Sequence, residues 1–305
     1  LERGYRITPT SGDEGSYPLT FRASLSEDDY TEATTTLIVT GSSAGSGTTK
    51  KVIVLGDSTT NNGIVVTKLN ENFSNDVMNI STIGTRGTAP NNHEGRSGWK
   101  FYSYFNPSDA DSIANGVENP WYNPSTETFD AEYYFENSGI DMPDWLFINL
   151  GINDTFGYTS DNDLAKNIMT IKERCNTMIA SIKAASPSTK IGLCLTIPPN
   201  HSQDAFGKAY ANGQTRDRYK RNNVIWVHDL IETYDGMESD GIYLIPIHTN
   251  LDTFYNMGME TLPVNARNTE VTYQSPIRNG GVHPVQSGYW QIADVYTAFL
   301  KAYAN

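Results

Sequence analysis

The chain has 305 residues, of which 38% are hydrophobic and 19% charged, and its formal net charge is −13. This composition suits a folded globular protein with a substantial core and excludes a disordered chain. So acidic a surface repels phosphate backbones, which disfavours a nucleic-acid partner, and no apolar run approaches the roughly 18 residues that a membrane span needs.

Residues 1–40 carry the pattern of a short β segment. Apolar and polar residues alternate over residues 17–25 and 31–40, and acidic turn residues lie between them, which predicts a hairpin. Two or three strands alone bury too little surface to be stable. The segment is therefore either the end of an immunoglobulin-like domain or a hairpin packed on the body. Residues 41–49, GSSAGSGTT, predict a flexible linker by their composition.

From residue 50 to residue 305, strand patterns alternate with helical patterns. Short apolar runs predict five strands, at residues 52–55, 77–83, 145–150, 191–197 and 224–227. Apolar residues at helical spacing predict helices over residues 65–73, 164–182 and 289–300. This alternation predicts one three-layer α/β/α domain with a mainly parallel, five-stranded sheet covered on both faces.

Two long segments interrupt the alternation, at residues 85–144 and 229–282. Both are rich in aromatic residues, Asn, Gly and Pro. Long irregular segments in a compact domain are usually functional loops, and ligands of such folds lie beyond the carboxyl ends of the strands. We expect both segments to shape a substrate site there.

The cysteines and the overall residue usage bear on the compartment. Cys175 falls in a helical pattern and Cys194 in a strand pattern, so both are predicted to be buried free thiols. Abundant Thr, Ser, Asn, Gly and Tyr indicate an extracellular protein, either secreted or virion-associated. No basic segment followed by an apolar run is present, so we expect any secretion signal to be removed or to lie upstream.

Residues 51–60, KVIVLGDSTT, place a serine at a strand-to-helix turn. The hydroxyl of Ser58 is exposed at such a tip, and the amides of a helix N-terminus can stabilise a developing oxyanion. The alternative is a loop serine that caps the helix. Residues 147–155, FINLGINDT, repeat the arrangement with Asn153 and Asp154 after a strand. The amide of Asn153 can donate to an oxyanion, or Asn153 can form an Asx turn.

His283 lies in GGVHPVQSGYWQIAD, just before the last predicted helix. An imidazole there can reach a serine at the sheet edge, or it can be a solvated or capping histidine. The other histidines, His93, His201, His228 and His248, are scattered and show no paired metal-ligand spacing. We therefore expect neither a metal nor a cofactor.

Taken together, these blocks resemble the SGNH/GDSL hydrolase superfamily, whose members carry a Ser in a GDS block, a Gly, an Asn in a GxND block and a His near the C-terminus. The matching residues are Ser58, Gly84 in STIGT, Asn153 and His283, and the resemblance covers residues 50–305. It implies the SGNH, flavodoxin-like sheet and a serine esterase. It also implies Ser58 as nucleophile, His283 as base, and an oxyanion hole made by Ser58, Gly84 and Asn153.

A second stretch narrows the resemblance. Residues 92–99, NHEGRSGW, resemble a segment of SGNH carbohydrate esterases such as acetyl xylan esterases. Residues 119–130 and the VHP-x3-GY-x-QIAD ending resemble hydrolase domains of phage structural proteins and gut-bacterial secreted proteins. The substrate implied is an O-acetyl group on a polysaccharide. Aromatic residues of the inserted loops, Trp99, Tyr102, Trp121 and Tyr158, either stack on sugar rings or pack in the loops. Arg96 either meets substrate or pins its loop.

One position departs from the superfamily. An Asp usually lies three residues before the catalytic His, where this chain has Gly280. A main-chain carbonyl at Asn279 or Gly280 can instead accept the Nδ1 proton, which leaves a Ser–His dyad. Alternatively, Asp252 substitutes for the missing acid, or the protein is catalytically feeble. The competing functions are therefore an acetylesterase, an esterase for other short acyl groups, and a non-catalytic carbohydrate-binding or virion structural domain. The oligomeric state is left open.

Overall fold

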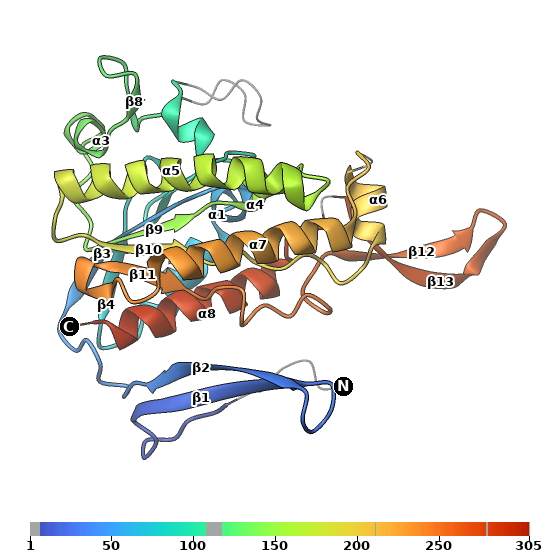
Figure 1. Ribbon diagram of the computed structural model, residues 1–305. Coiled ribbons are helices and arrows are strands. Elements are labelled where there is room, and N and C mark those ends of the chain that lie inside the picture. The colour runs from blue at the N-terminus through green and yellow to red at the C-terminus, as the bar shows by residue number, and fades with distance from the viewer. Residues whose placement is uncertain (1–6, 108–117, 211, 279, 305) are drawn as a thin grey trace.

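A computed structural model describes residues 7–107, 118–210, 212–278 and 280–304, and its body has three layers (Figure 1). The central sheet has the strand order β11-β10-β9-β3-β4-β6-β5, and every neighbouring pair is parallel except β5 with β6. Its strands are β3 (Thr49–Gly56), β4 (Asn79–Thr82), β5 (Arg86–Thr88), β6 (Asn91–Gly95), β9 (Trp145–Asn149), β10 (Lys190–Cys194) and β11 (Ile242–Ile245). The predicted α/β fold with a mainly parallel sheet is confirmed.

Helices cover both faces of this sheet because successive side chains of each strand point to opposite sides. Val52 and Val54 of β3 belong to a core shared with α2 (Ile64–Phe73) and α8 (Gln286–Ala302). Ile53 and Leu55 belong to the opposite core, which α3 (Ala131–Ser138), α5 (Asp161–Ala185) and α7 (Arg216–Tyr234) complete. Strands buried on both faces read as continuous apolar runs, which is how most of them were predicted.

The predicted number of strands and the position of the fifth are wrong. Residues 224–227 lie inside α7, and the strand at that edge is β11, which pairs with β10. A run of four apolar residues cannot by itself distinguish a strand from one turn of a buried helix. In α7 the buried residues recur at helical spacing, with Tyr219, Trp226, Leu230 and Tyr234 facing the core.

The segment at residues 85–144, predicted to be irregular, adds the strands β5 and β6 to the central sheet. β6 takes the place of β4 beside the last residues of β3. β4 pairs with β3 only as far as Val52, and β6 then pairs with Leu55 and Gly56 of the same strand. The antiparallel hairpin of β5 and β6 brings the chain to this position beside β3. The residues that flank the carboxyl end of β3 therefore come from β6, at His93 to Gly95, and not from β4.

The remaining elements lie around this body. After β6 come the 3₁₀ helix η1 (Tyr102–Phe105), β7 (Tyr122–Asn123) and β8 (Thr128–Phe129). The short helices are α1 (Ser58–Asn61), α4 (Ile152–Phe156), α6 (Asp204–Tyr210) and the 3₁₀ helix η2 (Glu238–Asp240), which lies between α7 and β11. The other long segment, residues 229–282, contains β11 and an arm formed by β12 (Met259–Asn265) and β13 (Asn268–Pro276), which projects from the body (Figure 1).

The predicted hairpin is present at the N-terminal end. β1 (Gly15–Ser24) pairs antiparallel with β2 (Tyr30–Val39), and nearly every residue of both strands is exposed. Residues 41–49, predicted to be a flexible linker, instead form turns bound to the body. Gly45 is buried against Met78 and Ala304, the Gly47 N–H donates to the Val77 carbonyl, and Lys301 Nζ donates to the Ser42 carbonyl. The composition of residues 41–49 is typical of a linker, but it does not reveal these contacts with the body.

Both cysteines are buried free thiols, as predicted. Cys194 Sγ lies 3.0 Å from Tyr296 Oη in the core beneath α8. Across the described ranges, none of the helices combines the length and apolarity needed to span a membrane.

Candidate active site

The turn after β3 carries Ser58 and is packed so closely that it has no room for a side chain at Gly56. A Cβ on Gly56 would collide with Thr60 Oγ1 and lie 2.9 Å from the Asn149 carbonyl, so glycine is required there. Asp57 caps α1 by accepting from the Thr59 N–H at 2.8 Å. Asn149, at the end of β9, donates to Thr59 Oγ1 and Thr60 Oγ1. The strand end, the cap and the neighbouring strand thus fix α1, with Ser58 as its first residue.

His283 meets Ser58 across 225 positions of sequence. Ser58 Oγ lies 2.7 Å from His283 Nε2, a hydrogen-bond distance. The loop that carries the imidazole is held on both sides: the Asn200 N–H donates to the Gly281 carbonyl, and the Val285 N–H donates to the Asn256 carbonyl. The pairing of Ser58 with His283 that the motifs predicted is therefore present as geometry. A serine hydroxyl in contact with an imidazole is the arrangement that general-base activation of a nucleophile requires.

Gly280, Asn279 and Asp252 were predicted as possible partners of the His283 Nδ1 proton. The Gly280 carbonyl accepts from Asn200 Nδ2 at 2.9 Å, and Asn279 lies outside the described residues. The Asp252 carboxylate caps its own turn through the Phe254 and Tyr255 N–H groups, and no ion pair joins it to His283 within the described parts of the chain. A role for Asp252 in place of the missing acid therefore stays a prediction.

Asp57 is a fully buried carboxylate directly before the serine. Its Oδ1 accepts from the N–H and the hydroxyl of Thr59, whereas Oδ2 has no hydrogen-bond partner among the described residues. Burial raises the pKa of Asp57, and the bonds from Thr59 and the nearby His283 lower it in part. The carboxylate thus lies within electrostatic range of the imidazole, in addition to its capping role.

Asn153 lies in α4, just after β9. Its Nδ2 donates to the Trp99 carbonyl at 3.0 Å, which uses one of its two amide hydrogens. Asp154 accepts from the Phe101 N–H at 3.0 Å, and burial raises its pKa to about 7. The pair therefore joins the GxND block to residues 99–101, the end of the loop that follows β6.

The strand register does not favour Gly84 as a neighbour of the nucleophile. Gly84 follows Thr82, which pairs with Val52, and a Cβ there would collide with the His93 carbonyl. Gly95 instead pairs with Gly56, and a Cβ on it would collide with the backbone of Asn61 in α1. The glycine beside the turn that carries Ser58 is thus Gly95, whose N–H donates to His93 Nδ1 at 3.0 Å.

Three residues predicted as a possible substrate loop are interior instead. Trp99 and Trp121 are fully buried, so neither ring can stack on a sugar. Arg96 forms an ion pair with Glu94 at 2.8 Å, with both side chains buried, and its guanidinium lies over the Trp99 ring. Of the two alternatives for Arg96, the structure therefore favours the one in which it pins the loop. Glu94, which was not predicted, accepts from Arg96, Tyr134, Trp121 and the Thr85 N–H and holds the cluster together.

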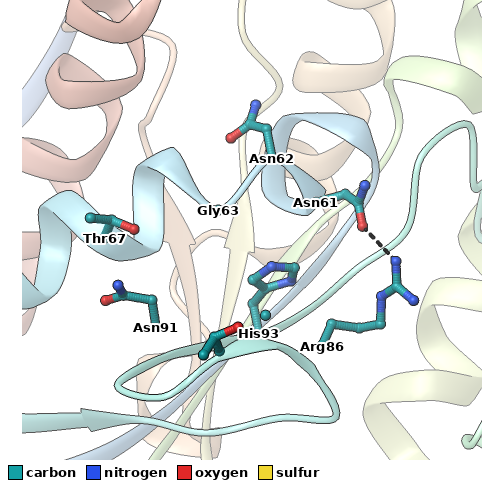
Figure 2. A pocket seen from close by; sticks show the side chains of 9 residues that line it. Asn61, Asn62, Gly63, Thr67, Arg86, Asn91 and His93 are labelled. Carbon is teal, nitrogen blue, oxygen red and sulfur yellow. Dashed lines mark hydrogen bonds between the residues drawn. The ribbon is translucent and has the colours of Figure 1, made fainter.

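A polar pocket lies beside α1, on the side of the β5–β6 hairpin. Its volume is about 340 Å³, and residues 61–63, Thr67, residues 86–88, Asn91 and His93 line it. Figure 2 shows the Arg86 side chain reaching toward Asn61, whose Oδ1 accepts from Arg86 Nη2 at 3.1 Å. In the described ranges, no group of three or more His, Cys, Asp or Glu side chains is arranged to hold a metal ion.

No family model matches the chain, and no curated protein matches it significantly. Among solved structures it is similar to a family 3 carbohydrate esterase of Clostridium thermocellum, with 18% identity, a TM-score of 0.47, and coverage of 84% of this chain and 100% of that one. It is also similar to a family 3 carbohydrate esterase from Talaromyces cellulolyticus (18% identity, TM-score 0.44, coverage 82% and 96%). An acetyl esterase solved with an acetate ion is a third (16% identity, TM-score 0.45, coverage 82% and 96%). Further similar structures are described as a GDSL-like lipase from Parabacteroides merdae and an acylhydrolase from Bacteroides fragilis.

The sequence pattern gave little indication of the pocket residues. Arg86 and His93 lie on β5 and β6, inside a segment that was predicted to be irregular, and Asn61 looked like an ordinary residue of the helix after the serine. The one available signal was position, since Asn61 and Arg86 follow within six residues of predicted strand ends, and no such signal marked His93. Their convergence depends on the hairpin, which a single sequence does not reveal.

Proposed function

We propose that the protein is a serine esterase in which Ser58 is the nucleophile and His283 the general base. The observation that carries this proposal is the 2.7 Å contact between Ser58 Oγ and His283 Nε2 at the carboxyl end of the sheet. His283 takes the hydroxyl proton as Ser58 attacks an ester carbonyl, and it then protonates the leaving alcohol. Water then attacks the acyl group on Ser58. His283 takes the proton of the water and returns a proton to Ser58 Oγ as the acid leaves.

Two donors are proposed for the oxyanion. The first is the Ser58 N–H, which makes no hydrogen bond within the described chain, as is usual for the first amide of a helix. The second is the remaining hydrogen of Asn153 Nδ2. Loss of one such donor costs about 3 kcal/mol of transition-state stabilisation. Gly84 is not retained in this proposal, because the register places Gly95 beside the turn.

For the substrate we propose O-acetyl groups on a polysaccharide, acted on by an extracellular or virion-associated enzyme. Two observations support this choice. Residues 92–99 resemble a segment of SGNH carbohydrate esterases, and the pocket beside α1 is lined by polar side chains and glycine rather than by an apolar surface. A polar pocket suits a sugar better than a long acyl chain.

The test is acetate release from p-nitrophenyl acetate and from acetylated xylan. Ser58→Ala and His283→Gln should each lower kcat about a thousandfold or more, because either change removes the activated nucleophile. The controls are Ser74→Ala and His228→Gln, at exposed positions outside the site, which should retain wild-type rates. If the wild-type protein is as inert as Ser58→Ala, the enzyme proposal fails. If long-chain esters are turned over faster than acetate, the acetyl assignment fails.

A further inference from the structure

The pocket beside α1 carries an unneutralised positive charge. Its lining contains no carboxylate, and among the described residues the Arg86 guanidinium donates to the neutral Asn61 Oδ1. Within the described residues, Arg86 forms no ion pair. In a protein with a net charge of −13, this pocket therefore offers a locally cationic lining.

His93 adds a neutral donor to the same pocket. The residue is buried, with 3% of its surface exposed, and its Nδ1 accepts from the Gly95 N–H at 3.0 Å, so the ring proton is on Nε2. Burial, together with Arg86 and Arg96, lowers the pKa of His93 to about 4 and keeps the ring neutral. Nε2 faces the space left by two glycines, since a Cβ on Gly63 would lie 3.9 Å from it and one on Gly87 3.3 Å.

The pocket lies one helical turn from the nucleophile. Asn61 is three residues after Ser58 in α1, which is about 4.5 Å along the helix axis. Figure 2 shows Asn61, His93 and Arg86 converging on the same side of α1. A group bound by Arg86 and the Nε2–H of His93 would therefore belong to the sugar that carries the ester or to its neighbour.

We propose that this pocket is a subsite for a carboxylate of the substrate, so that the preferred substrates are acetylated acidic polysaccharides whose sugars include uronic acids. This inference rests on the proposed esterase function and specifies its substrate class. The Arg86 guanidinium and the Nε2–H of His93 donate to the carboxylate, and Asn61 orients the guanidinium. Guanidinium–carboxylate bonds are charge-assisted and among the stronger hydrogen bonds in proteins.

The first experiment compares one polymer in two states. Acetate release is measured on acetylated polygalacturonate with free carboxylates and on the same polymer after methyl esterification. The wild-type protein should show a KM about tenfold lower for the free acid, the equivalent of one charge-assisted contact. Arg86→Met should abolish that difference, and Arg86→Lys should retain part of it. Arg22→Met, in a surface pair with Glu32 on the hairpin, is the control and should behave as wild type.

The second experiment does not depend on turnover. Unacetylated oligogalacturonate is titrated calorimetrically into the wild-type protein, Arg86→Met and Arg22→Met. Binding to the wild type and to Arg22→Met, but not to Arg86→Met, supports the subsite even if no ester is hydrolysed. Acetate release with no discrimination between the two polymers and no oligomer binding overturns the subsite and leaves the esterase intact. Tighter binding of a sulfated galactan oligomer than of oligogalacturonate would overturn the carboxylate assignment.

Discussion

At the scale of single residues, the Arg96–Glu94 pair shows how a charged residue near the site can be purely structural. Both side chains are buried, and Tyr134 and Trp121 also donate to the carboxylate. Removing one partner of such a pair leaves an uncompensated buried charge, which typically costs about 3–5 kcal/mol. The pair stabilises the start of the loop after β6, and therefore the surroundings of Gly95 and the turn that carries Ser58.

Asp154 gives a pH-dependent prediction. Its native pKa of about 7 lies above the ordinary value of 3.8, so the native state binds the proton more tightly than the unfolded state. The stability contributed by the protonated group is complete below about pH 4 and is lost as the pH rises through 7. Asp154→Asn preserves an acceptor for the Phe101 N–H without the charge. It should gain stability relative to wild type between pH 4 and pH 8, by an amount on the order of 4 kcal/mol.

The measurement is the free energy of unfolding by urea for both proteins across that pH range. Other titrating groups occur in both proteins and largely cancel in the difference. A difference that stays constant from pH 4 to pH 8 would show that Asp154 is already ionised at low pH.

At the scale of elements, the turn that carries Ser58 depends on the absence of a side chain at Gly56. Gly56→Ala would force the new Cβ against Thr60 and the Asn149 carbonyl, and α1 would shift. A displacement of 1 Å at a nucleophile lowers turnover by about a hundredfold. We therefore expect kcat on p-nitrophenyl acetate to fall by that order.

The matched control is Gly157→Ala, since the structure has open space around the position of its Cβ. Circular dichroism and the unfolding midpoint establish that each variant is folded. If Gly56→Ala keeps the wild-type kcat, the turn tolerates a Cβ and does not constrain Ser58 in this way.

Long amphipathic helices and buried apolar strands could be predicted from the sequence, and elements that depend on the β5–β6 hairpin could not. The helices α2, α5 and α8 and the strands β3, β4, β9 and β10 follow from apolar spacing. Residues 224–227 were misassigned because four apolar residues fit a strand and a buried helix equally well. The displacement of β4 by β6 depends on strand pairing between distant residues, which local patterns do not encode.

The same distinction applies to the candidate site. Ser58, Asn153 and His283 were identifiable because each lies at a strand end or before a terminal helix. The burial of Trp99 and Trp121 and the convergence of Arg86 with His93 depend on how residues 85–144 fold back on the body. Their residue types alone left sugar stacking and loop packing open for the aromatic residues and indicated a scattered histidine.

At the scale of the whole molecule, the N-terminal hairpin and the body differ in how firmly they are connected. β1 and β2 are almost entirely exposed, whereas residues 42–47 are bound to the body at Lys301, Met78 and Val77. Deleting residues 1–40 should leave the unfolding midpoint of the body and the proposed esterase activity unchanged. Deleting residues 1–47 should lower the midpoint, because it also removes the contacts of Gly45 and Ser42.

Thermal unfolding of the full chain and of the two truncated chains measures this difference. Equal destabilisation by both deletions would place the stabilising contacts in the hairpin itself. Equal stability of all three chains would mean that residues 42–47 contribute little to the body.

The packing of Gly45 against Ala304 brings the first and last described parts of the body together. A folded unit whose two ends are adjacent can be joined end to end and reopened in an exposed loop, or placed within a loop of another protein, without disturbing its interior. A circularly permuted chain that links residue 304 to residue 45 and opens at the tip of the β12–β13 arm would preserve the approach of Ser58 to His283. We therefore expect the body to keep this geometry when other chains are fused to its two adjacent ends.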